Sequence, residues 1–371
     1  MEKIKVLHVV HNFLKGGIEG FLYYLLCAQK KDYKLEVHVL CCCEEDEVVN
    51  PRIKKLGIPI HYIKIKPSDL DIRKYYKACK LANGFDIVHI HLFLPILCYA
   101  MAFSKAKILF TMHGAGSIRR NINLKIRFKE FLLTFFLNNI CDGIANNSNF
   151  TKEYWIRNSV KNSIYNQTIY NGVFFNNQYD VNAVYKEYPN LKTKKLIGTT
   201  CRLIPWKRVD FLIDAYTSIV NHLPDNWDLL IVGEGSELNK LKEKAKQNNA
   251  EHRIHFVGYK SNVTDYQAVM NVCVFPSAEE PFGLVAIECL HLGKPVYVMS
   301  DGGGLVEIVN KLSHKYIAKD VEDLAAKLLL EANGEKNNLE LSIKYSNSFT
   351  IEKTENGYWN MYKLIVSKNG K

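Results

Sequence analysis

The sequence predicts an α/β protein that contains two doubly wound parallel-sheet domains. In each half of the chain, short and nearly continuous apolar segments alternate with helical patterns, as is typical of parallel strands covered on both faces. The length of 371 residues exceeds that of one usual domain, and an apolar content of 47% is enough for two hydrophobic cores. We therefore expect two similar domains that face each other across a central cleft.

The apolar segments divide the chain into regions. In the first half they lie at residues 4–10, 35–42, 58–65, 86–92, 107–114 and 143–148. A polar, asparagine-rich stretch then interrupts the alternation, which resumes at 195–201, 228–235, 253–259, 273–277 and 295–300. We predict an N-terminal domain over 1–172, a linker over 173–194, a C-terminal domain over 195–348, and a C-terminal helix over 349–371 that packs back on the first domain.

The chain is basic. Its net charge of +11 and pI of about 9.0 favour an anionic partner, such as a nucleic acid, a membrane surface or a phosphorylated substrate. Between residues 105 and 131, basic residues are interleaved with large apolar ones. This composition fits a helix that lies on an anionic membrane, and it also fits an ordinary helix with a core face and a solvated basic face. The residues assigned to a membrane surface are Arg119, Arg120, Lys125, Arg127 and Lys129.

The cysteines and the N-terminus indicate a compartment. The ten cysteines are scattered through apolar segments without paired spacing, which is typical of a reduced protein. No apolar run is long enough to span a membrane, and the N-terminus has no signal-peptide pattern. We therefore expect a cytoplasmic protein.

Two motifs resemble metal sites, and we assign neither to a metal. Asp69 and Asp71 form a DxD sequence, but they precede a helical pattern and fit a helix-capping segment better. His89 and His91 share one face of a strand, but the sequence indicates no third ligand.

Polar or glycine-rich motifs follow several of the predicted strands, where parallel sheets bind ligands. HNFLKGGIEG contains Gly16 and Gly17, and glycines there let backbone N–H groups approach a phosphate, although any tight turn also uses them. TTCRLIPWKRVD contains Arg202 and Lys207, a pair that suits a diphosphate, although a lone cation is more often solvated. MSDGGGLVEIV forms another glycine-rich turn between a strand and a helix.

A pair of glutamates stands in the stretch PSAEEPFGLVAIECLHLGKPV. Glu280 lies in a predicted strand-to-helix turn, and Glu288 lies about two turns into the helix. A glutamate before a helix favours the helix dipole, and a glutamate within a helix is usually solvated. Glu288 is flanked by Ile287 and Cys289, which makes solvation less certain. The pair alone leaves its role open.

In order and spacing, these motifs resemble those of the retaining GT-B glycosyltransferases that use nucleotide-sugar donors (glycosyltransferase family 4-like, glycosyl transferases group 1). The resemblance covers nearly the whole chain. Its motifs are the first Gly-Gly pair, VHIHL, TMHG, IYNGV, CRLIPWKRVD, LLIVGEGSEL, IHFVGY, PSAEEPFGLVAIECL and GGGLVEIV. The resemblance implies the GT-B fold, in which two Rossmann-like domains face a central cleft.

The resemblance also implies roles for individual residues. Arg202 and Lys207 would hold the donor diphosphate, Glu280 would bind the donor sugar, and Glu288 would bind the ribose. His113 would face the sugar from the first domain. The other donor-binding positions implied are Gly16, Gly17, Gly258, Tyr259, Phe282, Gly283 and Leu284.

The implied reaction transfers a sugar with retention of configuration and without a metal or other cofactor, because fixed cations stabilise the leaving diphosphate. The implied partners are a nucleotide sugar (a UDP-sugar) and a lipid-linked or oligosaccharide acceptor, and the basic segment adds an anionic membrane surface. A polyprenyl-diphosphate-linked saccharide of bacterial surface polysaccharide, such as O-antigen or capsule, would suit an enzyme on the inner face of the cell membrane. The chain departs from the family pattern at Cys201, which replaces a glycine, and at Pro281, where a glycine is common.

Two other functions compete with this interpretation. A sugar-nucleotide epimerase of the same architecture binds the same donor but needs no acceptor, so acceptor-dependent release of UDP separates the two enzymes. A basic nucleic-acid-binding protein is disfavoured because the basic segment is interleaved with apolar residues and no recognised binding module is present.

Overall fold

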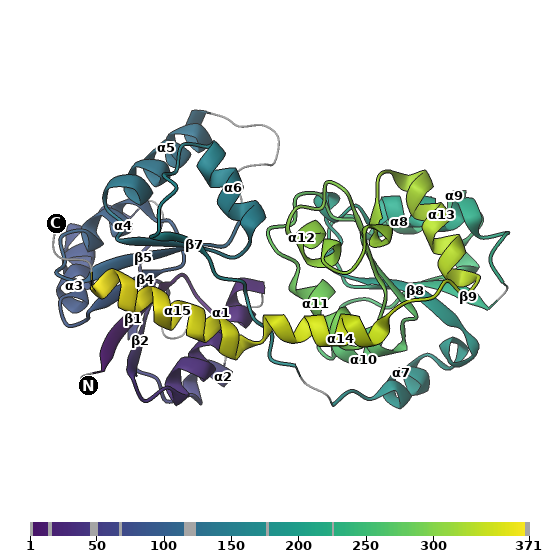
Figure 1. Ribbon diagram of the computed structural model, residues 1–371, viewed down its shortest axis with the longest axis horizontal. Coiled ribbons are helices and arrows are strands. Elements are labelled where there is room, and N and C mark those ends of the chain that lie inside the picture. Colours follow the sequence, from purple (N-terminus) through teal and green to yellow (C-terminus); the bar gives the residue numbers. More distant parts are fainter. Residues whose placement is uncertain are drawn as a thin grey trace. The chain divides into compact units, whose positions relative to one another are not determined.

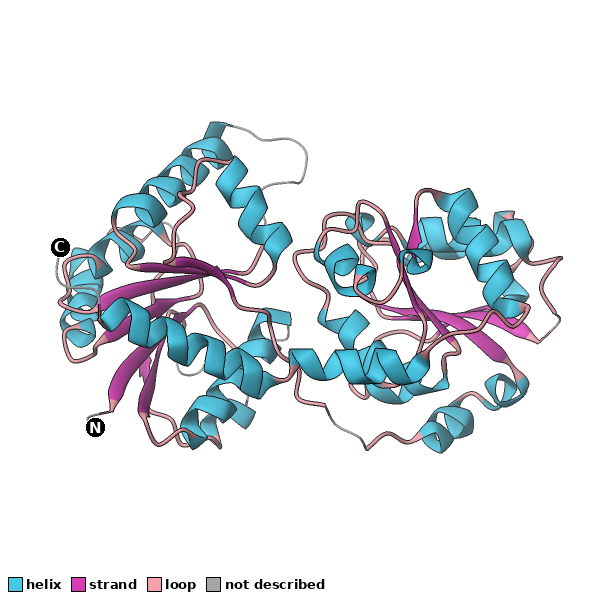
Figure 2. Ribbon diagram, viewed as in Figure 1, coloured by secondary structure: helices cyan, strands magenta, loops and turns pink. Residues whose placement is uncertain are grey.

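The structure, a computed structural model, describes residues 3–13, 17–44, 51–66, 69–114, 124–175, 178–224 and 226–367. Its contacts divide the chain into two compact units, one formed by Met1–Phe174 with Ile351–Lys371 and the other by Phe175–Thr350. Each unit contains a parallel sheet with helices on both faces (Figures 1 and 2). The prediction of two doubly wound parallel sheets is therefore confirmed.

The first unit contains a seven-stranded sheet of order β3-β2-β1-β4-β5-β6-β7. Its strands are β1 (Ile4–Val10), β2 (Leu35–Cys41), β3 (Ile60–Tyr62), β4 (Ile87–Ile90), β5 (Lys107–Met112), β6 (Gly143–Asn146) and β7 (Asn166–Thr168). The order reverses between β1 and β4, where His8 lies opposite His89. In such sheets, ligands bind at the carboxyl ends of the strands beside this reversal.

Seven helices are described for this unit. They are α1 (Gly17–Lys31), α2 (Pro51–Lys54), α3 (Ile72–Ala82), α4 (Pro95–Met101), α5 (Leu124–Asn139), α6 (Asn149–Arg157) and α15 (Ile351–Val366). Asp71 caps α3 by accepting a hydrogen bond from the backbone N–H of Arg73, which confirms the capping interpretation of the DxD sequence. The last helix, α15, packs against α1 and β5 (Figure 1). It buries Tyr358 and Tyr362.

The second unit contains a six-stranded sheet of order β10-β9-β8-β11-β12-β13. Its strands are β8 (Lys195–Thr200), β9 (Trp227–Val232), β10 (Ile254–Phe256), β11 (Val272–Phe275), β12 (Val296–Met299) and β13 (Ile317–Ala318). Its α-helices are α7 (Val181–Glu187), α8 (Val209–Ile219), α9 (Leu238–Gln247), α10 (Val263–Val269), α11 (Leu284–His291), α12 (Gly304–Asn310), α13 (Val321–Ala332) and α14 (Leu339–Ser346). Five 3-10 turns are η1 (Pro189–Thr193), η2 (Pro205–Lys207), η3 (Glu251–Arg253), η4 (His314–Tyr316) and η5 (Asn347–Phe349). The order reverses between β8 and β11.

The stretch 173–194, which its polar composition predicts as a linker, is largely folded. It contains α7, which Asp180 caps, and the turn η1. Val184 and Leu191 are buried, and α7 packs against α10. These few apolar side chains are enough to attach a mainly polar segment to the second unit. No helix among the described residues has both the length and the apolar character that crossing a membrane requires.

Candidate active site

The donor-binding residues predicted in the second half of the chain lie at the carboxyl edge of one sheet. Arg202 and Lys207 follow β8, Tyr259 follows β10, and Glu280 follows β11. Because β8 and β11 are neighbours, their two loops lie beside the reversal of strand order. The fold therefore brings the predicted cations and the first glutamate to the position where doubly wound sheets bind ligands.

Lys207 and Glu280 form an ion pair. The Lys207 Nζ lies 2.5 Å from Glu280 Oε2, and the two side chains are 12% and 16% exposed. The same ammonium lies 4.2 Å from the ring centroid of Trp206, a cation–π distance. Arg202, in contrast, is exposed on the loop after β8. The largely buried position of Lys207 was not expected from the sequence.

A second ion pair at this edge was not predicted. Arg208 Nη1 donates to both carboxylate oxygens of Asp301, at 2.9 and 2.7 Å. Arg208 has a left-handed backbone, with φ of 49°, at the start of α8. This conformation is uncommon for an arginine, and the sequence gives no signal for it. The pair connects the loop after β8 to the loop after β12.

The Gly-rich turn at residues 302–304 holds the backbone of Glu280. Glu280 N–H donates to Gly302 O at 3.2 Å, and Gly304 N–H donates to Glu280 O at 2.7 Å. A Cβ on Gly304 would lie 2.6 Å from the Cα of Phe282, so only glycine permits this approach. The turn that the sequence suggested as a ligand-binding feature thus has a structural task, which is to fix the position of Glu280.

Helix α11 begins four residues after Glu280. Its N-cap is Gly283, with φ of 110°, where a Cβ would lie 2.4 Å from Leu305 Cδ2. Leu284 is the first helical residue, so its N–H belongs to the positive end of the helix dipole. The Phe282 side chain is only 3% exposed and packs edge-on against Phe349. Phe282 was predicted to bind the donor, but its side chain belongs to the core, which leaves only its backbone at the edge.

Glu288 is held by a glutamine. Gln267, a fully buried residue of α10, donates from Nε2 to Glu288 Oε2 at 3.2 Å and lies 3.3 Å from Thr200 Oγ1. Burial raises the pKa of the Glu288 carboxyl above its usual value, and the hydrogen bond from Gln267 opposes this rise. Gln267 was not identified from the sequence, where it is one polar residue in an ordinary helical pattern.

Gly258 and Tyr259 lie at the outer end of the same edge, after β10. Gly258 has φ of 72°, and its carbonyl accepts a hydrogen bond from Gly233 N–H at 2.8 Å. Tyr259 is 53% exposed, so its ring presents an aromatic surface at this edge. Such a surface suits stacking against a planar base.

His113 follows β5 in the first unit and ends a chain of buried histidines. His113 Nε2 lies 3.0 Å from His91 Nδ1, and His91 Nε2 lies 2.9 Å from His8 Nδ1. His8 Nε2 lies 2.8 Å from Gln29 Oε1, which can only accept. Burial lowers the pKa of His8 and of His113 to about 4, and that of His91 also falls well below its usual value.

Because the rings are neutral, each histidine has one donor and one acceptor nitrogen, and this fixes the direction of the hydrogen bonds. With the amide of Gln29 oriented as described, His8 must donate to it, His91 must donate to His8, and His113 must donate to His91. The remaining nitrogen, His113 Nδ1, is therefore an acceptor, and it is buried without a hydrogen-bond partner among the described residues. An unpaired buried acceptor at a ligand-binding edge can receive a hydroxyl hydrogen from a ligand.

The structure corrects the expectation that His89 and His91 have no third neighbour of their kind. His8, His89 and His91 place ring nitrogens within 4.8 Å of one another, a group that can hold a metal ion. His89, however, already lies 2.8 Å from Tyr362 OH and 2.7 Å from Thr111 Oγ1. Every ring nitrogen of the three therefore has a hydrogen-bond partner, which a metal ion would have to displace.

The remaining predicted residues lie in the first unit. Gly17 is the first residue of α1, and a Cβ there would have no described heavy atom within 4 Å. Lys125, Arg127 and Lys129 are exposed on α5. Gly16, Arg119 and Arg120 lie outside the described residues.

Comparison with known proteins gives the same picture for both halves. Residues 15–174 match the family model "Glycosyltransferase Family 4", and residues 182–344 match "Glycosyl transferases group 1". The chain is 26% identical to the N-acetyl-alpha-D-glucosaminyl L-malate synthase of Bacillus anthracis, over 82% of each chain. It is 22% identical to the O-antigen biosynthesis glycosyltransferase WclY of Escherichia coli, over 98% of this chain and 99% of that protein.

Solved structures agree on the fold. The crystal structure of Anabaena HepE with UDP and glucose matches with a TM-score of 0.78 at 17% identity, over 97% of this chain and all of that one. The fold and the site define a GT-B glycosyltransferase that uses a nucleotide-sugar donor. The chain belongs to the glycosyl transferases group 1.

Proposed function

We propose that this protein is a retaining glycosyltransferase that moves a sugar from a UDP-sugar to a lipid-linked saccharide in the assembly of bacterial surface polysaccharide. The observation that carries the proposal is the set of charged groups at the carboxyl edge of the second sheet. Lys207 lies on the loop after β8, and Glu280 and the N-terminus of α11 follow β11, the neighbouring strand at the reversal of strand order. Cations and backbone N–H groups suit the diphosphate, and the carboxylates suit hydroxyl groups.

In this proposal, the bond between the anomeric carbon and the diphosphate breaks as the bond to the acceptor oxygen forms. The proton of the acceptor hydroxyl passes to the departing UDP, so the charges balance without a metal. Lys207 and Arg202 stabilise the developing charge on the diphosphate. The product keeps the anomeric configuration of the donor in this route, because the acceptor hydroxyl approaches from the side of the departing UDP, which takes its proton.

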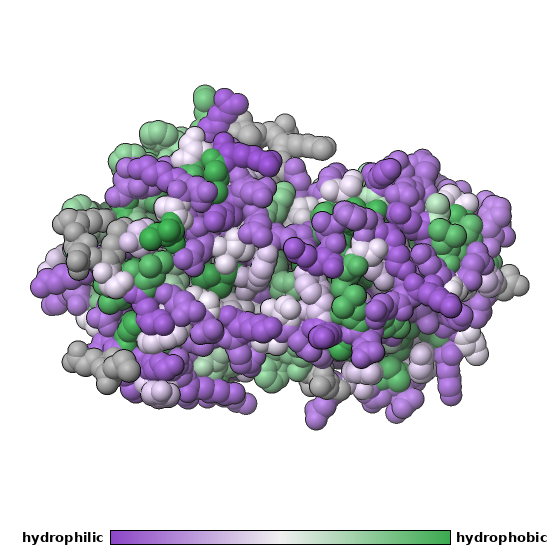
Figure 3. Space-filling view, viewed as in Figure 1, coloured by the Kyte–Doolittle hydropathy of each residue, from purple (hydrophilic) through white to green (hydrophobic). Residues whose placement is uncertain are grey.

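The surface of α5 supports a membrane-bound acceptor. Leu124, Phe128, Phe131 and Phe135 follow one another at intervals of four, three and four residues and are 84, 64, 63 and 49% exposed. The opposite face of the helix, with Leu133, Phe136 and Leu137, is buried in the core. Both faces of α5 are thus apolar, and Figure 3 shows apolar and polar surface side by side over this helix. An exposed aromatic stripe flanked by Lys125 and Lys129 suits the interface of an anionic membrane.

The names of the relatives point to two different acceptor classes. WclY is named for O-antigen biosynthesis, whereas the Bacillus anthracis relative is named as an N-acetyl-alpha-D-glucosaminyl L-malate synthase, and L-malate is a small anion. The decisive assay supplies a UDP-sugar together with either a prenyl-diphosphate-linked saccharide or L-malate and measures the release of UDP. We expect release only with the lipid-linked saccharide, and we expect nuclear magnetic resonance of the product to show the anomeric configuration of the donor.

Three results would contradict this proposal. Rapid interconversion of the UDP-sugar without an acceptor would identify an epimerase, and preference for malate would place the protein with small-molecule transferases. An inverted product would exclude the retaining route. A screen of nucleotide sugars by thermal shift identifies the donor first, because a ligand that binds the native state raises its melting temperature.

A further inference from the structure

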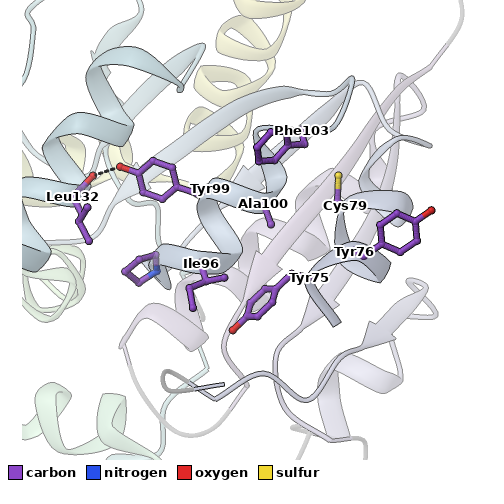
Figure 4. A pocket seen from close by; sticks show the side chains of 9 residues that line it. Tyr75, Tyr76, Cys79, Ile96, Tyr99, Ala100, Phe103 and Leu132 are labelled. Carbon is purple, nitrogen blue, oxygen red and sulfur yellow. Dashed lines mark hydrogen bonds between the residues drawn. The ribbon is translucent and has the colours of Figure 1, made fainter. Parts of the chain in front are cut away.

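A groove in the first unit is lined by residues of which none is a predicted donor-binding residue. It has a volume of about 580 Å³, within the range of sites for small ligands, and its lining is almost wholly apolar. Figure 4 shows α4 in the middle, with residues of α3 on one side and Leu132 of α5 on the other. The lining residues are Tyr75, Tyr76, Cys79, Pro95, Ile96, Tyr99, Ala100, Phe103 and Leu132.

The few polar atoms near the groove are mostly engaged within the protein. The hydroxyl of Tyr75 donates to the carbonyl of Asp69 at 2.5 Å, and that of Tyr99 donates to the carbonyl of Leu132 at 3.0 Å. The walls therefore offer a ligand little hydrogen bonding. A peptide would lose hydration of its backbone in such a groove without replacement, whereas a hydrocarbon chain would lose nothing.

The groove is open, and its apolar surface is continuous with that of α5. Phe103, Tyr76 and Ile96 are 85, 69 and 43% exposed, although they are large and apolar or aromatic. Leu132 lines the groove and adjoins Phe131 of the exposed stripe on α5. Lys77 and Lys80 are exposed on α3, one and four residues beyond Tyr76. Apolar walls bordered by cations complement an anionic lipid, whose chain is apolar and whose head group is negatively charged.

We infer that the groove between α3 and α4 binds the hydrocarbon chain of the prenyl lipid that carries the acceptor. This inference rests on the proposed function for the identity of the lipid. The groove would then distinguish a long-chain acceptor from a water-soluble one. The exposed stripe of α5 contacts the membrane, and the groove binds the hydrocarbon chain of one lipid molecule.

The binding test uses the full chain and a fifteen-carbon prenyl monophosphate with a photoreactive group at the end of its tail. We expect cross-links on α3 and α4, located by mass spectrometry of peptides, and competition by the unlabelled prenyl phosphate but not by inorganic phosphate. Ala100→Phe fills the groove and should lower labelling about tenfold. Ala102→Phe adds the same ring to an exposed position outside the lining and should leave labelling unchanged.

Ile96→Ser removes apolar surface without adding bulk. It replaces Ala100→Phe in this test if that variant fails to fold, and it should also lower labelling. Labelling elsewhere, or equal labelling of the filled and control variants, overturns the inference. A third result also overturns the inference. If the wild type self-associates, Ala100→Phe abolishes the association and the prenyl probe labels nothing, the groove is an interface between copies of the protein. If the groove is labelled but no lipid-linked acceptor receives sugar, the proposed function fails, and the groove is a prenyl-binding site that does not serve the acceptor. If the Ala100→Phe and Ala102→Phe variants use the lipid-linked acceptor equally well, the groove inference fails and the proposed function stands.

Discussion

The ammonium of Lys207 lies 2.5 Å from the carboxylate of Glu280, and both side chains are largely shielded from water. A donor diphosphate that reaches Lys207 therefore competes with an existing partner. The competition has a useful consequence, because the two charges neutralise each other while the site is empty. In the proposed reaction, Glu280 would become available to sugar hydroxyls as the ammonium of Lys207 turns toward the phosphates.

The first prediction concerns the two cations. Arg202→Ala and Lys207→Ala should each lower turnover by about two to three orders of magnitude, as expected for the loss of one fixed stabilising group. Arg202 is exposed, so its removal should leave the melting temperature unchanged. Lys207→Ala leaves a largely buried carboxylate unpaired, which should cost about 2 kcal/mol and lower the melting temperature by about 4–8 °C.

Steady-state kinetics and thermal unfolding of the two variants check this prediction. Adding Glu280→Gln to Lys207→Ala removes the unpaired charge and should restore most of the lost stability without restoring turnover. Full activity of both single variants would exclude the diphosphate role.

The second prediction separates the two glutamates by pH. A carboxylate accepts hydrogen bonds from ribose hydroxyls, and the partly buried Glu288 has a pKa above its usual value. The affinity for UDP should therefore fall as the pH decreases from 7 toward 5, because protonation of Glu288 then begins at a higher pH than for an ordinary glutamate. Glu288→Gln should bind UDP more weakly and lose this part of the pH dependence.

Glu280→Gln is the matched control, since Glu280 is assigned to the donor sugar. It should bind UDP as the wild type does at each pH and use the UDP-sugar poorly. Titration calorimetry with both ligands measures these differences, and equal losses of UDP affinity in the two variants would contradict the separate roles.

Much of the fold could be predicted from the sequence, and the exceptions have physical reasons. The buried central strands are nearly continuous apolar runs, such as WDLLIV in β9. The edge strands β7 and β13 were missed because one has the polar sequence NQT and the other has two residues. Arg202, Lys207 and Glu280 were singled out because charged residues stand out at the ends of apolar strands, and Glu288 because it lies among apolar residues in a predicted helix.

The partners of these residues could not be predicted in the same way. Gln267 meets Glu288, and Asp301 meets Arg208, only because α10 and the loop after β12 fold against other elements. His8 and His89 face each other because β1 and β4 are neighbours in register, although 81 positions separate them. Such meetings depend on strand order, which local sequence patterns do not contain.

The third prediction concerns the direction of the histidine chain. Gln29→Met keeps the length of the side chain but removes the acceptor for His8, so the rings lose the group that fixes their tautomers. In protein labelled with ¹⁵N-histidine, His113 of the wild type should show an unprotonated Nδ1 and a protonated Nε2. Gln29→Met should show a mixture, and His113→Gln identifies the signals. A protonated Nδ1 in the wild type would reverse the assigned direction.

The same histidines predict a pH dependence of stability. The pKa of His8 and of His113 is about 4 in the folded protein, below the 6.5 of an exposed histidine. Their contribution to the free energy of unfolding is complete above about pH 6.5. It is lost as the pH falls toward 4, because the unfolded chain takes up protons that the folded chain does not. The slope of the free energy of unfolding against pH gives the number of protons taken up on unfolding. Near pH 5 this number should be about one lower for His8→Asn than for the wild type. An unchanged proton uptake would mean that His8 is charged or accessible in the folded protein.

The last prediction concerns the exposed face of α5. Each basic residue close to an anionic surface contributes about 1 kcal/mol to binding, and exposed aromatic rings add insertion into the interface. The wild type should sediment with anionic liposomes at low salt and less at high salt. Lys125→Glu, Arg127→Glu and Lys129→Glu made together should release it, and so should Phe128→Ser with Phe131→Ser. As a control of equal charge, Lys240→Glu, Lys242→Glu and Lys246→Glu on α9 should leave binding to liposomes largely intact. If the α9 variant is released as readily as the α5 variant, binding follows the net charge of the chain, and the stripe on α5 has no special part in it.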